Sequence, residues 1–257
     1  MRGSVRRWLA VGLAGAVALG VTALAVPVSS AAGDATIYLV QGLPGKTVTF
    51  AVDGKTVASG QKSGTVSSPV AVSSGKRRVT VSASGRTIVD QTVSVGAGWS
   101  ADVVVHLPTD PNGKPLLTTY KNDLAAVSKD KASLTVAHTA AVPPADVTVD
   151  GKVLFEDIAN GQSLHLVVPV ATYEVAIVPT GKSKPVYFGP VDLTVQGGSL
   201  NAVYAIGNPA SKTMNVVVHV LDTKGGSSGS GKPKRVNTGS GGQAVGAHVT
   251  ELPALTR

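Results

Sequence analysis

The sequence contains no cysteine at any of its 257 positions. This absence excludes disulfide bonds, thiolate metal sites, cysteine nucleophiles and a lipid anchor on cysteine. Aromatic residues are also scarce, with two Trp, five Tyr and three Phe. Any core must therefore be built from aliphatic side chains. Valine is the commonest of these, and β-branched residues favour strands.

Catalytic patterns are missing as well. The sequence has no H-E-x-x-H pair and no phosphate-binding loop, and its one G-x-S-x-G match, Gly225–Gly229, lies in the Gly/Ser-rich tail, where we do not expect an oriented nucleophile. Among the five histidines, His138, His165 and His219 fall in strand-like segments, where two of them could come together; we predict isolated strand histidines instead. Glu156-Asp157 is interpreted as a loop pair, too local to act as a separated acid and base. We therefore predict a protein that is not an enzyme, with no catalytic, metal or cofactor residues and no cofactor. A cryptic hydrolase is the remaining alternative.

The N-terminal 32 residues have the three parts of an export signal. Arg2, Arg6 and Arg7 precede the uncharged run Trp8–Val26, and small residues continue to Ala32. We predict a signal helix that is cleaved after Ala32. A retained membrane anchor is the alternative, and Arg6-Arg7 leaves a twin-arginine route open. The predicted location is outside the cell or on the outer side of its envelope.

The net charge of +8 is concentrated at the two ends of the chain. Residues 33–222 hold fifteen basic and fourteen acidic side chains, so this part is almost neutral. The balance excludes nucleic acid as a partner for the folded region. Residues 223–257 are rich in Gly and Ser, and we predict a disordered basic tail. That tail is either simply solvated or a weak contact for anionic wall polymers.

The chain contains an internal repeat. Val52-Asp53-Gly54-Lys55 recurs as Val149-Asp150-Gly151-Lys152, 97 residues later, and the surrounding apolar pattern repeats with it. We predict two domains of the same kind, residues 33–124 and 125–222. Membrane contact is expected only through the leader, if that stays uncleaved.

Each repeat is a series of short apolar segments separated by glycine turns. Asp53-Gly54 and Asp150-Gly151 are typical of two-residue hairpin turns. The pattern predicts an all-β protein of two tandem antiparallel β-sandwiches, similar to immunoglobulin or transthyretin domains. Lys121–Lys131 is the one helix-compatible piece, interpreted as a linker. The basic run Lys76–Arg78 is interpreted as a solvated sheet edge.

The second repeat carries a family resemblance. A strand ending in His138 is followed by the loop Pro143-Pro144-Ala145 and the strand-and-turn Asp146–Gly151. This order, with Pro169–Tyr173 further on, resembles the bacterial Domain of Unknown Function 4397 family. Val170-Ala171-Thr172 departs from that family's pattern. The resemblance implies exported β-sandwich modules without established catalytic residues.

The first repeat resembles the family more loosely. Gln41 stands where the histidine would be, and Leu43-Pro44-Gly45 replaces the proline-rich loop. We therefore predict an exported, non-enzymatic protein with a structural, adhesive or binding role at the cell envelope. Its partner would be a wall polymer or an envelope protein.

The alternative function is a module that binds carbohydrate or cell-wall polymer. Trp99 is the weak candidate for such a ligand site, because a tryptophan ring can stack on a sugar; Tyr38 and Tyr173 would assist. Packing of Trp99 at a sandwich edge is the competing interpretation. The sequence does not indicate the oligomeric state.

Overall fold

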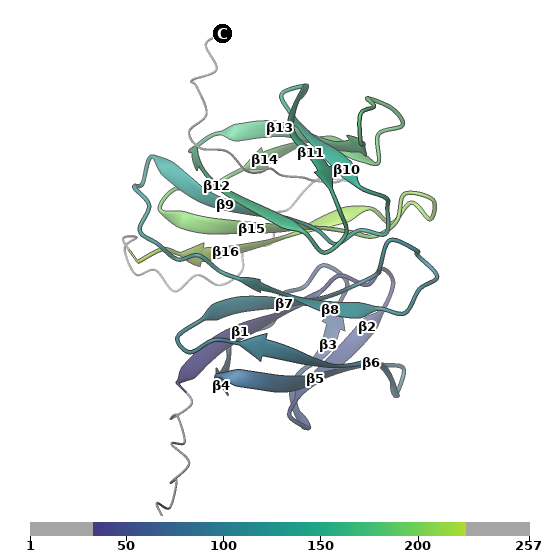
Figure 1. Cartoon of the computed structure of the whole chain (residues 1–257), viewed down its shortest axis with the longest axis vertical. Helices are drawn as coiled ribbons and strands as arrows, with labels where there is room; N and C mark the ends of the chain where they lie inside the picture. The colour runs from purple at the N-terminus through teal and green to yellow at the C-terminus, as the bar shows by residue number, and fades with distance from the viewer. Residues whose placement is uncertain (1–32, 225–257) are drawn as a thin grey trace, which may run out of the picture. The chain divides into compact units, whose positions relative to one another are not determined.

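Alternating apolar and polar residues form strands throughout residues 33–224, the part of the chain that the computed structural model describes (Figure 1). Between these residues there are sixteen strands and no helix, and hence no helix that could cross a bilayer. The all-β prediction is confirmed. The predicted signal helix and nearly all of the predicted disordered tail lie outside the described residues.

The first eight strands form the first sandwich. They are β1 (Asp34–Gln41), β2 (Thr47–Val52), β3 (Lys55–Lys62), β4 (Val70–Ser73), β5 (Gly75–Ala83), β6 (Arg86–Val95), β7 (Ser100–His106) and β8 (Leu116–Lys121). One sheet has the order β4-β1-β7-β8 and the other the order β3-β2-β5-β6.

The last eight strands form the second sandwich. They are β9 (Lys131–His138), β10 (Ala145–Val149), β11 (Lys152–Ile158), β12 (Ser163–Pro169), β13 (Thr172–Pro179), β14 (Phe188–Thr194), β15 (Ser199–Ile206) and β16 (Asn215–Asp222). The sheet orders are β12-β9-β15-β16 and β11-β10-β13-β14, so each strand has the same neighbours as the strand eight places earlier.

The prediction of β-sandwiches is confirmed, with one difference in strand direction. In the first sandwich β1 pairs parallel with β7, and in the second β9 pairs parallel with β15. All other pairs are antiparallel. A parallel pair needs a long connection. Here the five intervening strands supply it, which local sequence patterns do not reveal.

Each sandwich has its own aliphatic core, and strand alternation decides which side chains enter it. In β1, Ile37 and Leu39 point into the first core, which also contains Phe50. The second core includes Leu134 and Phe155. Val40, on the opposite face of β1, takes part in a third apolar cluster.

The third cluster lies between the two sandwiches. Val40 and Val104 of β1 and β7 meet Leu200, Tyr204 and neighbouring residues of the second sandwich. All eight residues of β15 are consequently buried, because the second core covers one face and the first sandwich the other. The two sandwiches thus share a continuous apolar contact.

The hairpin turns have the predicted conformation. Asp53 and Gly54 have φ angles of 48° and 82°, and Asp150 and Gly151 have 49° and 73°. Positive φ at both central positions is the requirement of a type I′ turn. Each aspartate also accepts a backbone amide hydrogen bond from β5 or β13, at 2.9 Å from Arg78 and 3.1 Å from Glu174.

Three local predictions are wrong. Lys121–Lys131 contains no helix: residues 122–128 have no regular secondary structure, and residues 129–130 form a turn. Glu156 and Asp157 lie in β11, where Asp157 adopts φ 56° at a register shift, so they are not in a loop. Lys76–Arg78 begins β5, an inner strand between β2 and β6, and therefore protects no sheet edge.

Candidate functional site

A buried carboxylate joins the two sandwiches. Asp102 of β7 is completely buried. Its Oδ2 accepts hydrogen bonds from the Tyr204 hydroxyl at 2.6 Å and from His219 Nδ1 at 2.8 Å, and its Oδ1 accepts one from Asn122 Nδ2 at 2.9 Å. We call these four residues the Asp102 network. Tyr204 and His219 belong to the second sandwich, so the network crosses the contact between the two.

The tyrosine hydroxyl of the network is held in its neutral form. Burial, together with the nearby Asp102 carboxylate, raises the pKa of Tyr204 well above its usual value. Tyr38 packs its ring edge-on against His219, with centroids 4.4 Å apart, and burial and Asp102 raise its pKa too. The two carboxylate oxygens of Asp102 thus have hydrogen-bond partners on Tyr204, His219 and Asn122. The network therefore joins the two sandwiches through buried hydrogen bonds.

Two other histidines lie beside this contact. His106 is fully buried; Nδ1 is 2.8 Å from the Leu107 carbonyl and Nε2 is 2.9 Å from Thr118 Oγ1. A neutral imidazole that donates from Nδ1 and accepts at Nε2 satisfies both partners. Burial lowers the pKa of His106 to about 4, and nearby His138 adds to the effect.

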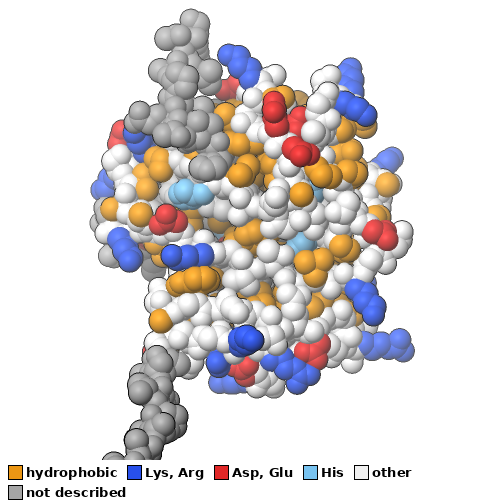
Figure 2. Space-filling model, in the orientation of Figure 1, with side chains coloured by type: hydrophobic (Ala, Val, Ile, Leu, Met, Phe, Trp, Pro, Cys, Tyr) orange, Lys and Arg blue, Asp and Glu red, His pale blue; other side chains and the backbone are white. Residues whose placement is uncertain are grey.

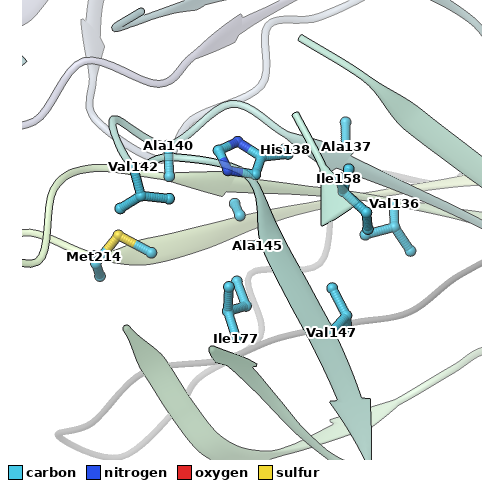
Figure 3. A pocket seen from close by; sticks show the side chains of 11 residues that line it. Val136, Ala137, His138, Ala140, Val142, Ala145, Val147, Ile158, Ile177 and Met214 are labelled. Atoms are coloured by element: carbon cyan, nitrogen blue, oxygen red, sulfur yellow. The ribbon is translucent and has the colours of Figure 1, made fainter. Parts of the chain in front are cut away.

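His138 lines a small cavity at one end of the second sandwich (Figure 3). Its Nε2 is 3.4 Å from the Pro143 carbonyl, its Nδ1 is buried without a hydrogen-bond partner, and burial lowers its pKa. The other lining side chains are apolar, with Met214 opposite the ring. The cavity volume is about 20 Å³, room for roughly one water molecule.

The position equivalent to His138 in the first sandwich indicates the structural role of this side chain. Gln41 occupies it and is fully buried. Its side chain binds the following loop, donating to the carbonyls of Leu43 and Lys46 and accepting from the Leu43 amide at 2.8 Å. His138 braces its own loop through Pro143 in the same way. In each repeat, the side chain at this position therefore forms hydrogen bonds with the loop that follows the first strand.

A larger apolar groove opens between the two sheets of the second sandwich. It has a volume of about 160 Å³. Eight of its ten lining residues are apolar: Leu134, Val149, Val153, Leu154, Leu166, Val168, Val175 and Leu193; the other two are Lys152 and Tyr173. We call this set the apolar groove. It contains no carboxylate, imidazole or serine, and its polar groups are the Lys152 ammonium and the Tyr173 hydroxyl.

The first sandwich has a different hollow at the equivalent place. Lys55 and Val70 there correspond to Lys152 and Leu166 in the groove, and Arg77 corresponds to Tyr173. That hollow is wider, about 550 Å³, and its wall is largely polar. Arg77 forms an ion pair with Asp53 across it, at 3.0 Å.

Trp99 lies in the turn before β7. Its ring is half-buried against the first core and lies over Gly96, while the Lys121 ammonium is 5.6 Å from the ring centroid. The packing interpretation describes this geometry well. Sugar binding by Trp99 remains an untested prediction.

Gly96→Ala is expected to displace the Trp99 ring. A methyl group at position 96 would lie 2.3 Å from Trp99 Nε1, closer than any real contact. We expect a loss of about 1–3 kcal/mol in the free energy of unfolding and a red shift of the tryptophan emission. Ala97→Ser, at the exposed neighbouring position, is the control. An unchanged emission spectrum for Gly96→Ala would contradict this packing.

The remaining predicted side chains are dispersed. Tyr173 donates its hydroxyl to the Pro169 carbonyl at 2.9 Å and lines the apolar groove. His165 contacts Thr135 at 3.1 Å, whereas His219 joins the Asp102 network. Among residues 33–224, no three His, Asp or Glu side chains are grouped so as to hold a metal ion. His248 lies outside the described residues.

The surface charge fits the near-neutral balance of the sequence. On the face shown in Figure 2, basic and acidic side chains are interspersed, and apolar side chains are frequent over the second sandwich. The large apolar residues that are most exposed, Val153, Val167, Val170 and Val186, all belong to that sandwich.

Sequence reasoning missed the groove and the Asp102 network. The strands that line the groove read as ordinary apolar segments, and Asp102 stands alone in a valine-rich strand. The aspartate inside this valine-rich strand was the one sequence feature that could have indicated a buried polar network.

Comparison with known proteins gives one family match. Residues 35–145 match the family model described as "Domain of unknown function (DUF4397)". The matched stretch covers the first sandwich and ends at the start of β10, whereas the sequence likeness is clearest in the second repeat. No curated protein matches the chain.

Proposed function

Because the family model that matches residues 35–145 describes no activity, we propose a function from the geometry of this chain. We propose a non-enzymatic binding protein that acts outside the cytoplasmic membrane and holds an apolar ligand in the apolar groove. The leader sequence supports the location. Of the structural, adhesive and binding roles predicted, the groove favours binding.

The volume and lining of the groove carry this proposal. A dry cavity of roughly 150 Å³ lined by aliphatic and aromatic side chains is enough to bind benzene. The groove has about 160 Å³ and eight apolar lining residues, and it opens at the flank where the edge strands β11 and β12 face each other. Small-molecule sites are usually concave, apolar and largely pre-formed. The groove has these properties.

A titration with 1-octanol, followed by the methyl NMR signals of Leu154, Leu166 and Leu193, tests the proposal. We expect shifts confined to the groove and a Kd on the order of 0.1–1 mM, in the range that ligand efficiency allows. Leu154→Trp, which places an indole in the half-buried mouth, should weaken binding at least tenfold. Val57→Trp, at the equivalent position of β3, is the matched control.

Thermal unfolding separates loss of the groove from loss of the fold. If Leu154→Trp unfolds, Val153→Trp offers a second block, since Val153 is 49% exposed and tolerates a larger side chain. A folded variant with unchanged octanol binding would refute the assignment of the groove. Equal shifts in both sandwiches would also refute it.

A further inference from the structure

We propose that the ligand of the apolar groove is a single alkyl chain with an anionic head group, the chain lying between the sheets and the head at Lys152. This inference rests on the proposed function and adds the chemical class of the ligand. It is drawn from the shape of the groove, the Lys152 ammonium at its rim and the contrast with the first sandwich.

The shape favours one linear chain. The lining residues of one sheet come from all four of its strands, from Val153 on β11 through Val149 and Val175 to Leu193 on β14. Strands lie about 4.8 Å apart, so this wall spans roughly 14 Å. With only about 160 Å³ along that length, the groove is narrow. A narrow apolar slot accepts an alkyl chain and rejects a broad ring system.

The charge at the rim favours an anionic head group. Of the two polar lining residues, Tyr173 already donates its hydroxyl to the Pro169 carbonyl. Lys152 is exposed at the start of β11, and no ion pair found within residues 33–224 includes it. The neighbouring Asp150 carboxylate accepts the Glu174 amide across the turn. The Lys152 ammonium is thus available to a carboxylate, sulfate or phosphate ester.

The first sandwich lacks an equivalent apolar site, so we place the ligand in the second sandwich alone. Its hollow has the equivalent Lys55, but Arg77 replaces Tyr173 and pairs with Asp53. An alkyl chain there would meet charged groups and lose the apolar contacts that stabilise it. The repeat therefore provides an internal control on the same polypeptide.

A head-group series on the full chain tests the inference. Methyl NMR titrations would compare octanoate, 1-octanol and octyltrimethylammonium, which share the chain and differ in charge. An exposed ion pair contributes up to about 1 kcal/mol, so we expect octanoate to bind roughly threefold to fivefold more tightly than octyltrimethylammonium at low salt. Lys152→Glu should reverse that order and affect the uncharged 1-octanol less than either charged ligand. Lys55→Glu should change neither.

The outcomes separate this inference from the proposed function. If all three ligands bind the groove equally, or Lys152→Glu leaves the order unchanged, the anionic head group is refuted and the apolar site stands. If none of them shifts the groove signals, the proposed function fails as well. Preference for naphthalene over octanol would refute the alkyl chain while retaining an apolar site.

Discussion

Asp102→Ala is expected to lower the free energy of unfolding by about 3–5 kcal/mol. Removing one partner of a buried charged network leaves the others desolvated and unpaired. In this protein Tyr204 and His219 would lose their acceptor inside the contact between the sandwiches, and Asn122 Nδ2 would keep only its hydrogen bond to Ser100 Oγ. Denaturant unfolding at neutral pH measures the loss. The transition should also broaden or split, because the second sandwich loses its anchor to the first.

Asp90→Ala is the matched control. Asp90 pairs with Arg78 on the exposed face of the first sandwich, and this pairing lowers the Asp90 pKa and raises that of Arg78. Exposed pairs contribute little to stability. The same substitution should thus have a small effect at position 90 and a large one at position 102. Similar losses at both positions would show that the Asp102 network does not hold the sandwiches together.

Acidification from pH 7 to pH 4 is expected to cost about 3 kcal/mol through His106 alone. The folded pKa of His106 is about 4, below the unfolded value of 6.5, so the unfolded chain binds the proton more readily. Stability is therefore full above pH 6.5 and falls as the pH drops towards 4. His138, whose pKa burial also lowers, adds to the loss in the same direction.

The variant His106→Gln isolates this contribution. Glutamine can keep one hydrogen bond to Leu107 or Thr118 and cannot be protonated. It should be less stable than the parent protein at pH 7, and its stability should depend less on pH between 6.5 and 4. Carboxylates titrate equally in both proteins, so the difference between the two curves reports the histidine. Parallel curves would contradict the burial of a neutral His106.

The sequence predicts the sandwich architecture because its signals are local. Strand alternation and Asp-Gly turns depend on a few neighbouring residues, and both turns have the predicted φ angles. Strand β11, whose residues Glu156 and Asp157 were interpreted as a loop, begins with Lys152 and continues as three adjacent apolar residues, Val153–Phe155, which breaks the period of two. Glu156 and Asp157 then look like a loop, although a bulge accommodates them in the strand.

The groove and the Asp102 network depend on distant parts of the chain. Asp102 and His219 are 117 residues apart, and Leu134 and Leu193 meet in the groove only after four strands have been placed. The parallel pairs β1–β7 and β9–β15 have no local signature either. A single sequence does not reveal which outer faces are buried, and this explains why the packing of Tyr38 on His219 was not predicted.

The contact around β15 joins two sandwiches that belong to one polypeptide, so their association is intramolecular. Two sandwiches that met through the same surface as separate chains would dissociate on dilution, whereas residues 122–130 tether them. Short tethers of this kind give effective concentrations in the millimolar range. The pairing should thus be independent of protein concentration. A single cut in the tether would turn it into an ordinary equilibrium with a measurable dissociation constant.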